Sequence, residues 1–362
     1  MRKYYIDNVR WITIILVVIY HVIYMFNGII TEGIIGPITT THYQDTIQYI
    51  LYPWFMVILF IISGMCAKYY LDNHSDKEFI CVRTRKLLIP STIGVFVFGW
   101  IQGYFNMAMS DAFSNIPDTV PGFAMYLIMS VSGIGVLWTI QVMWLLSLVL
   151  LFVRKIEKGR LYKLGKKANI IVLILLGIPV WGAAQILNTP VICVYRFGIY
   201  GFCFLLGYYV FSHDEVISQL EKYCIPLLIA AVFLGGCYTY FYFGENYAQS
   251  PGVNCPLAIA YAWVACLGVI GGVKRWGDKT NAFAEFMRKK SFGLYVFHYL
   301  ALSATAYFLT KYTQTNPVVI YIVTAITAFG GGFLLYELIS RIPIIRWCVL
   351  GIKREKKQNV QG

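Results

Sequence analysis

Ten apolar stretches, each close to the ~20 residues that a transmembrane helix needs, take up most of this 362-residue chain. Backbone groups in lipid must be hydrogen-bonded within the chain, so each stretch is expected to be a helix. Residues 123–134 could add an interfacial or re-entrant segment before the fourth span. The predicted spans are 11–31, 47–69, 87–108, 135–153, 168–187, 195–212, 224–243, 254–273, 291–311 and 317–340.

Positive charge is confined almost entirely to one side of these predicted spans. Of the 30 lysines and arginines, all but Arg196 and Lys311 fall in segments that would face the same side. Cytoplasmic loops collect Lys and Arg. We therefore expect an all-α polytopic membrane protein of about ten transmembrane helices, with both termini in the cytoplasm.

The charge and the composition agree with this class. The net charge of +13 reflects the basic residues on the cytoplasmic side, where they would attract anionic lipid. It does not indicate a nucleic-acid partner. With 59% apolar and only 13% charged residues, the chain is unlike a soluble domain. We expect one transmembrane unit over residues 1–345, followed by a basic cytoplasmic tail over 346–362.

Arg10 and His21 lie on one face of the first predicted span. Eleven helical steps of ~100° return to within ~20° of the start, and they separate the two residues by ~16 Å along the axis. This places His21 near the middle of the bilayer and Arg10 near its cytoplasmic surface. Because an ionisable side chain is costly at that depth, His21 is a candidate functional residue.

A second histidine, His298, is expected at a similar depth in the ninth span, which runs in the same direction. Ser291, Tyr295 and His298 follow a spacing of four and then three residues, so they share one helical face. A single buried histidine bonded to a backbone carbonyl would be ordinary. Two at matched depth favour a shared polar cavity in the cytoplasmic half of the membrane.

Arg10, Arg83, Arg85 and Lys86 are expected to surround the cytoplasmic mouth of this cavity. Clustered guanidinium groups can bind a phosphate-bearing ligand through paired donors. For most of the inner basic residues, the general excess of positive charge on that side is the simpler explanation. Arg10 and Arg83 are partial exceptions because they lie at the predicted membrane boundary.

Neither a metal site nor a fixed disulfide is expected. His21 and His298 have no Cys or carboxylate at ligand spacing. Cys193 and Cys255 both map to outer loops and could pair, although two free thiols is the simpler reading. Most of the remaining cysteines fall inside spans, where they act as small apolar residues.

Two features of the tenth span have structural interpretations. Glu337 and Arg341 are four residues apart, which predicts an ion pair at the helix end. The run Gly330, Gly331 and Gly332 predicts close helix packing or a bend rather than a phosphate loop.

On the outer side, Trp138, Gln141, Tyr195 and Arg196 are candidates for contacts with an acceptor. Aromatic faces suit stacking on sugar rings. An aromatic belt at the membrane interface is nevertheless the simpler explanation for Trp138 and Tyr195.

Five segments, in order, resemble the integral-membrane acyltransferase family 3. The first is residues 5–10 (YIDNVR) followed by ten residues and His21, which resembles the family's Arg/Lys, ten residues, His pattern. The others are residues 60–64 (FIISG), residues 83–90 (RTRKLLIP), Leu137 and Trp138 with Leu145 and Leu146, and residues 291–298 (SFGLYVFH).

The chain departs from the family pattern at two of these segments. The usual R-x-x-R before the third helix is Arg83-Thr84-Arg85-Lys86 here, so the role of each basic residue is open. Thr139 stands where Phe is common after the tryptophan. Within these 362 residues no segment is expected to form an extracellular esterase domain, so a partner that completes acyl delivery would be a separate chain.

The resemblance implies an enzyme of the bacterial cytoplasmic membrane that transfers an acyl group, usually acetyl from acetyl-CoA, to a hydroxyl of an envelope or surface glycan. Arg10, Arg83, Arg85 and Lys86 would bind the anionic donor, and Arg10 would also belong to the catalytic set with His21. His21, neutral because burial disfavours its charged form, would act as general base or carry the acyl group. Ser291, Tyr295 and His298 would orient His21 or donate hydrogen bonds to the oxyanion.

A transporter or flippase for a small polar solute or glycan precursor is the alternative. In that function the same histidines would relay protons.

Overall fold

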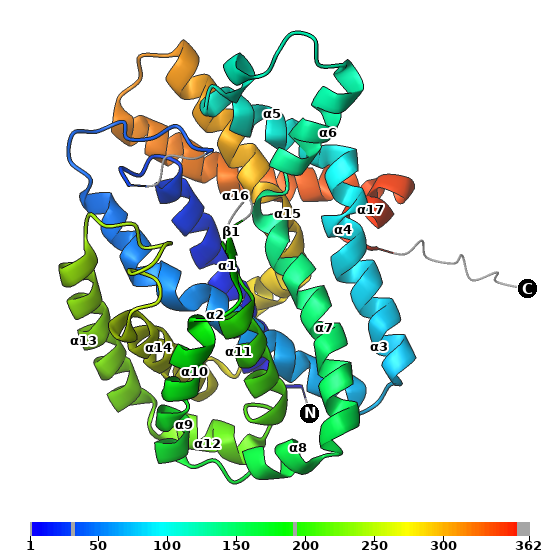
Figure 1. Ribbon diagram of the computed structural model, residues 1–362, viewed down its shortest axis with the longest axis vertical. Helices are drawn as coiled ribbons and strands as arrows, with labels where there is room; N and C mark the ends of the chain where they lie inside the picture. The colour runs from blue at the N-terminus through cyan, green and yellow to red at the C-terminus, as the bar shows by residue number, and fades with distance from the viewer. Residues whose placement is uncertain (1, 30–32, 191–193, 353–362) are drawn as a thin grey trace, which may run out of the picture.

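The computed structural model describes residues 2–29, 33–190 and 194–352, and these residues are almost all helical (Figure 1). Two short strands, β1 and β2, form an antiparallel pair on the side that we predict to be outer. The elements are α1 (Tyr4–Tyr24), η1 (Tyr43–Asp45), α2 (Thr46–Leu71), α3 (Asp76–Arg83), η2 (Thr84–Leu88), α4 (Ile89–Ser91), η3 (Val95–Gly99), α5 (Trp100–Met109), η4 (Ala112–Asn115), α6 (Gly122–Ser132), η5 (Gly135–Leu137), α7 (Trp138–Glu157), α8 (Arg160–Gly165), α9 (Ile170–Leu175), α10 (Gly177–Ala184), β1 (Asn188–Pro190), β2 (Val194–Arg196), α11 (Phe197–Tyr209), α12 (Asp214–Lys222), α13 (Cys224–Tyr242), α14 (Pro256–Gly277), α15 (Ala282–Tyr312), α16 (Pro317–Arg341) and α17 (Pro343–Leu350).

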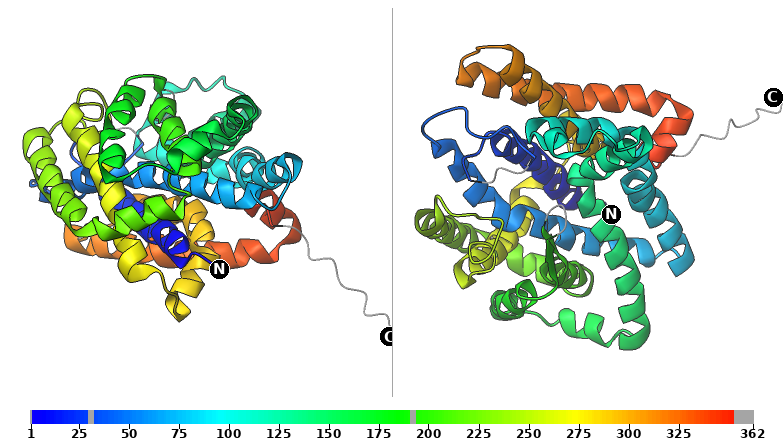
Figure 2. Two further views of the ribbon diagram at one scale, coloured as in Figure 1. Left: turned by 90° about the horizontal axis from the view of Figure 1, so that it is seen from below. Right: turned by 45° about the horizontal axis from the view of Figure 1, so that its top comes forward.

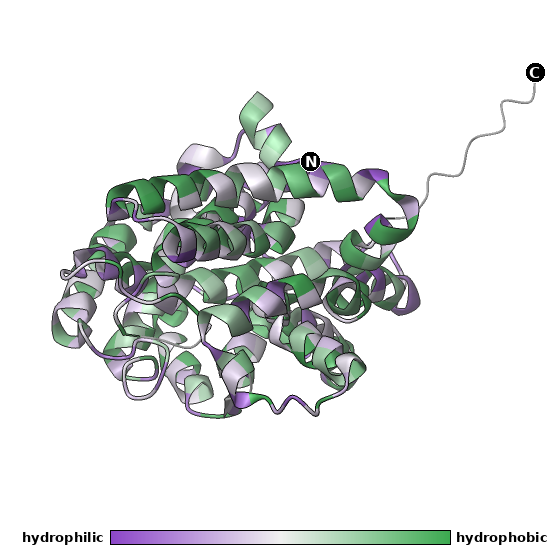
Figure 3. Cartoon of the chain, turned by 90° about the horizontal axis from the view of Figure 1, so that it is seen from above, coloured by the Kyte–Doolittle hydropathy of each residue, from purple (hydrophilic) through white to green (hydrophobic). Residues whose placement is uncertain are grey.

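Within the described residues, eight helices or helix runs are long and apolar enough to cross a membrane. Hydrophobic residues predominate along the helices in Figure 3. The predicted all-α membrane architecture is therefore confirmed, and the predicted number of about ten is approximate. The predicted span 168–187 is divided into α9 and α10 around Leu176, and α11 has only 13 residues because the chain enters it from β2.

The first helix begins and ends earlier than the predicted 11–31. Its polar first turn is helical because the loop between α14 and α15 caps it: Asp278 accepts from the backbone N–H of Tyr5, and the Asn8 amide donates to the carbonyl of Gly277. His21 consequently lies in the last turn of α1 rather than near its middle.

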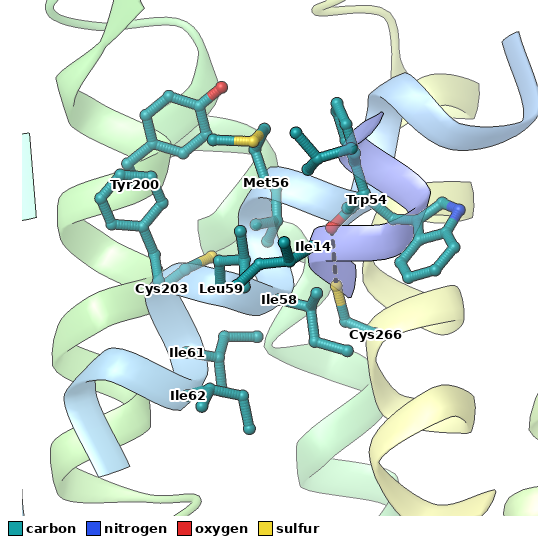
Figure 4. Close-up of a cluster of buried hydrophobic side chains, with 14 of the residues drawn as sticks. Ile14, Trp54, Met56, Ile58, Leu59, Ile61, Ile62, Tyr200, Cys203 and Cys266 are labelled. Atoms are coloured by element: carbon teal, nitrogen blue, oxygen red, sulfur yellow. Dashed lines mark hydrogen bonds between the residues drawn. The ribbon is translucent and has the colours of Figure 1, made fainter. Parts of the chain in front are cut away.

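α1 lies inside the bundle, in contact with α2, α14, α15 and α16 (Figure 2). The adjoining core joins α2 to α11 and α14 (Figure 4), where the Cys266 thiol lies 3.6 Å from the carbonyl oxygen of Trp54. Gly64 of α2 and Gly207 of α11 face each other. A Cβ on Gly64 would lie 2.0 Å from the carbonyl oxygen of Phe204, so only glycine permits this approach.

The glycine run of α16 packs against α15, as predicted. A Cβ on Gly332 would lie 2.9 Å from a methyl carbon of Leu294 and 3.3 Å from Cα of His298. The predicted pair Glu337–Arg341 is wrong. Glu337 instead pairs with Lys290 of α15, because the close packing of the two helices brings that lysine within reach.

Of the two outer cysteines that could pair, the structure describes only Cys255. Cys255 is a free thiol at the start of α14, where its sulfur accepts from the backbone N–H of Ala258. Cys193 lies outside the described residues.

Candidate active site

His21 and His298 come together between α1 and α15. Nδ1 of His21 lies 2.8 Å from the carbonyl oxygen of Val17, one turn earlier in α1. The fully buried His298 places its own Nδ1 2.9 Å from the carbonyl oxygen of Tyr295 and 3.1 Å from that of Leu294. Nε2 of His298 lies 3.2 Å from Nδ1 of His21.

These contacts define the protonation of the neutral pair. A carbonyl oxygen only accepts, so Nδ1 must carry the proton in both rings. His298 therefore offers the lone pair of Nε2 to the Nδ1–H of His21, which is shared with Val17. Nε2 of His21 is left unprotonated, and no described residue is hydrogen-bonded to it. His21 thus has one basic nitrogen available for chemistry.

His21 lines a cavity of about 490 Å³, within the range of small-molecule sites. We call it the outer cavity, because several of its other lining residues come from loops on the predicted outer side: Gly33, Ser110, Ala112, Asn246, Ala248 and Gln249. The sequence predicted a cavity in the cytoplasmic half. That expectation is wrong for this cavity, because α1 ends just after His21 and the loops fold back over it.

Tyrosine rings surround the His21 imidazole. The rings of Tyr20 and Tyr299 lie edge-on to it with centroids 5.1 Å away, and Tyr24 is 6.2 Å away. Tyr247, from the outer loop after α13, is fully buried and its hydroxyl lies 3.3 Å from that of Tyr20. These contacts restrict the orientation of the imidazole and fasten the loop over the cavity.

The other predicted residues of α15 are divided between the cavity and the helix packing. Tyr295 lines the outer cavity, and its hydroxyl donates to the carbonyl of Val136. Ser291 is buried two turns before His298 and is not among the residues that line this cavity. The predicted stripe therefore shares a face, but only Tyr295 of the three reaches the cavity wall.

The predicted basic residues gather at the inner end of α1. Arg10 is paired with Asp7 at 2.6 Å. Arg83 donates to the hydroxyl and the carbonyl of Ser63, both at 3.2 Å. Lys86 lies close enough to Arg10, Arg83 and Arg85 for their positive charges to repel its ammonium group.

The local backbone at this cluster is unusual. Arg85 and Lys86 lie in the π-helical segment η2, just before Pro90, which cannot donate a backbone hydrogen bond. The Nε of Arg85 is buried and has no hydrogen-bond partner among the described residues. A buried, unpaired guanidinium nitrogen is suited to receiving an anionic group.

Of the residues predicted to contact an acceptor, Trp138 lines the outer cavity. Gln141 donates to the carbonyl of Ser91 and accepts from the Tyr195 hydroxyl at 3.5 Å. Arg196 is only 2% exposed, and it donates to the carbonyl of Val253 and the side chain of Asn254. Arg196 thus holds the loop that precedes α14, and it does not line this cavity.

Several lining residues of the outer cavity were not predicted from the sequence. Tyr20 and Tyr299 are each adjacent in sequence to a predicted histidine, and this adjacency could have identified them. Tyr52 and Tyr200 lie outside the family motifs, and Thr139 was noted only as a departure from the family pattern. Asn246 and Gln249 lie in a loop whose folding back over the cavity is a tertiary feature.

The family model of acyltransferase family 3, described as an acyltransferase domain, matches residues 3–337, nearly the whole chain. No curated protein and no solved structure matches the chain significantly.

Proposed function

Because the chain belongs to acyltransferase family 3, we propose that it transfers an acetyl group from cytoplasmic acetyl-CoA to a hydroxyl of an envelope or surface glycan. The enzyme would act in the bacterial cytoplasmic membrane. The observation that carries this proposal is that His21 lines the outer cavity with Nδ1 2.8 Å from the Val17 carbonyl oxygen and 3.2 Å from Nε2 of His298. In the neutral pair this geometry leaves Nε2 of His21 as the basic nitrogen.

The donor would bind at the inner end of α1. Coenzyme A carries phosphates, and Arg10, Arg83, Arg85 and Lys86 concentrate positive charge there. Arg83 uses two of its five N–H groups on Ser63, which leaves donors for a phosphate. Arg10 lies about 16 Å from His21 along α1, so it would bind the donor rather than take part in the chemical step. The long, thin thioester arm would bridge that separation.

The acceptor would enter the outer cavity and meet His21. As the hydroxyl oxygen attacks the thioester carbonyl, Nε2 takes the hydroxyl proton, the new C–O bond forms and the C–S bond breaks. The imidazolium then protonates the leaving thiolate. In the alternative route, Nε2 attacks the thioester first, the C–S bond breaks and coenzyme A leaves as the thiolate. The acceptor hydroxyl then attacks the acyl-imidazole, the N–C bond breaks, and the hydroxyl proton neutralises the released thiolate.

His298 would act as a positioning residue in either route. When His21 is protonated, its Nδ1–H is shared between the Val17 carbonyl and the His298 lone pair, which stabilises the imidazolium. This is the role that the third member of a catalytic triad plays for its histidine.

The test uses purified protein in detergent with acetyl-labelled acetyl-CoA and a panel of methyl glycosides as acceptors. We expect labelled acceptor and free coenzyme A from the wild type, and neither from His21→Ala. Label that stays on the wild-type protein after rapid denaturation at neutral pH, that is lost on treatment with acid or hydroxylamine, and that His21→Ala lacks, indicates the acyl-imidazole route.

His74→Ala is the matched control. His74 also places Nδ1 near the carbonyl four residues earlier, at 3.0 Å, but it is exposed at the end of α2. Acetyl transfer by the His21→Ala protein would overturn the proposal, and so would the absence of transfer by the wild type.

A further inference from the structure

We propose that the outer cavity selects an uncharged, polyhydroxylated ring, such as a neutral sugar unit, and that the Thr139 hydroxyl is one of its contacts. This inference rests on the proposed function, in which the outer cavity holds the acceptor. It goes further by excluding acceptors that carry a carboxylate, phosphate or ammonium group.

The described wall of the outer cavity carries no charged side chain. Among the described residues that line it there is no Asp, Glu, Lys or Arg, although the wall includes six tyrosines, a tryptophan and a phenylalanine. A charged ligand moved from water into such a wall would lose hydration without gaining a counter-ion. Aromatic faces with neutral polar groups between them suit the apolar faces and hydroxyls of a sugar ring.

The charged side chains nearest to the outer cavity lie behind its wall or beside it in sequence. Arg196 lies behind the wall, with its guanidinium carbon 6.0 Å from the ring centroid of Tyr200, and one of its terminal nitrogens donates to Val253 and Asn254. Its Nε is buried without a hydrogen-bond partner among the described residues, and Arg196 does not line the cavity. Asp111 and Glu245 are exposed and adjoin lining residues in sequence. The charged side chains that adjoin the lining within the described residues are therefore acidic, which opposes the approach of an anion.

The Thr139 hydroxyl is a buried group that lacks a hydrogen-bond partner among the described residues. Thr139 lines the cavity and is 2% exposed, and its oxygen has no hydrogen-bond partner among the described residues. A buried hydroxyl without a partner is costly, so a ligand hydroxyl that bonds to it would be favoured. A site that reads a hydroxyl in this way discriminates against rings that lack it.

The test measures binding separately from catalysis. Saturation-transfer NMR on the purified protein in detergent compares methyl α-glucopyranoside with its 6-carboxylate analogue and its protonated 2-amino analogue. These probes have similar shapes and differ in charge. We expect the neutral glycoside to bind, and the two charged ones to bind at least about tenfold more weakly.

Substitution of Thr139 tests the assigned contact. Thr139→Val keeps the shape and removes the hydroxyl, and we expect it to weaken neutral-glycoside binding roughly two- to tenfold. Thr324→Val is the matched control, because Thr324 is fully buried in α16 with an unpartnered hydroxyl and does not line the cavity. Its binding should match the wild type.

A charge placed in the wall should reverse the selectivity. Gln249 is exposed at the cavity, so Gln249→Lys should fold, and we expect it to bind the carboxylate analogue several-fold better than the wild type does. Equal binding of a charged probe by the wild type, or no binding of the neutral glycoside, overturns the inference. So does an unchanged affinity in Thr139→Val.

Parallel assays of acetyl transfer separate this inference from the proposed function. Neutral-glycoside binding that Thr139→Val weakens, without any acetyl transfer, would remove the proposed function and leave the inference intact. Acetyl transfer to charged acceptors alone would retain the proposed function and overturn the inference.

Discussion

Nε2 of His298 lies 3.2 Å from Nδ1 of His21, although 277 positions separate the two residues in the chain. The backbone carbonyls around both rings determine which nitrogens carry protons. The basic nitrogen of His21 is consequently Nε2, which is not used in contacts with α1 or with His298.

Replacing His298 by Ala should lower kcat roughly 100-fold, because His21 loses the acceptor that orients it and stabilises its protonated form. The KM for acetyl-CoA should change little, since His298 is remote from the basic cluster. His298→Gln, which can still accept a hydrogen bond, should recover part of the activity. Steady-state kinetics over a range of pH check this. A large rise in KM with normal kcat would contradict the positioning role.

Replacing Arg83 by Gln should raise the KM for acetyl-CoA about 10- to 100-fold, the range expected for losing a charge-assisted contact with phosphate. Arg83→Lys should restore little, because one ammonium cannot contact both Ser63 and a phosphate in the same geometry. Arg341→Gln is the control, an exposed basic residue at the inner end of α16. Equal effects of the Arg83 and Arg341 substitutions would argue for general charge alone.

Gly332→Val should reduce thermal stability by about 1–3 kcal/mol and reduce acetyl transfer with it. A side chain there would push α16 away from Leu294 and from the backbone of His298. Gly330→Val is a close control, because a Cβ at Gly330 meets nothing within 4 Å. Thermal unfolding of both variants in the same detergent measures the difference, and similar midpoints would contradict this account of the packing.

His213, between α11 and α12, should make the folded protein less stable at low pH. Burial lowers the pKa of its imidazole, although a hydrogen bond with the carbonyl of Tyr162 at 2.9 Å opposes the shift. The unfolded chain therefore binds the proton first, and stability declines as pH falls below about 6.5, the usual histidine value, until the folded form also protonates.

His213→Asn should remove this part of the pH dependence. Thermal unfolding between pH 7.5 and pH 5 compares the variant with the wild type, and His74→Asn serves as an exposed-histidine control. An unchanged pH slope in the His213 variant would show that other groups are responsible.

Part of the candidate site could be predicted because helical spacing is a local property. The spacing from Ser291 to His298 places them on one helical face, and alternating positive charge orders the spans. The roles of Gly64 and Ser63 in the FIISG segment could be recognised only from the structure. Gly64 admits the backbone of α11, and Ser63 holds Arg83.

The amino-acid sequence by itself determined the membrane class, the approximate spans and the two histidines, since apolar length and residue spacing act within one helix. Only the tertiary structure decided that the two imidazoles touch, that Glu337 pairs with Lys290, and that outer loops enclose a cavity over His21 whose described lining carries no Asp, Glu, Lys or Arg. The physical reason is that these features depend on how separate helices cross and how loops fold back. Such contacts between distant segments leave no periodic trace in the chain.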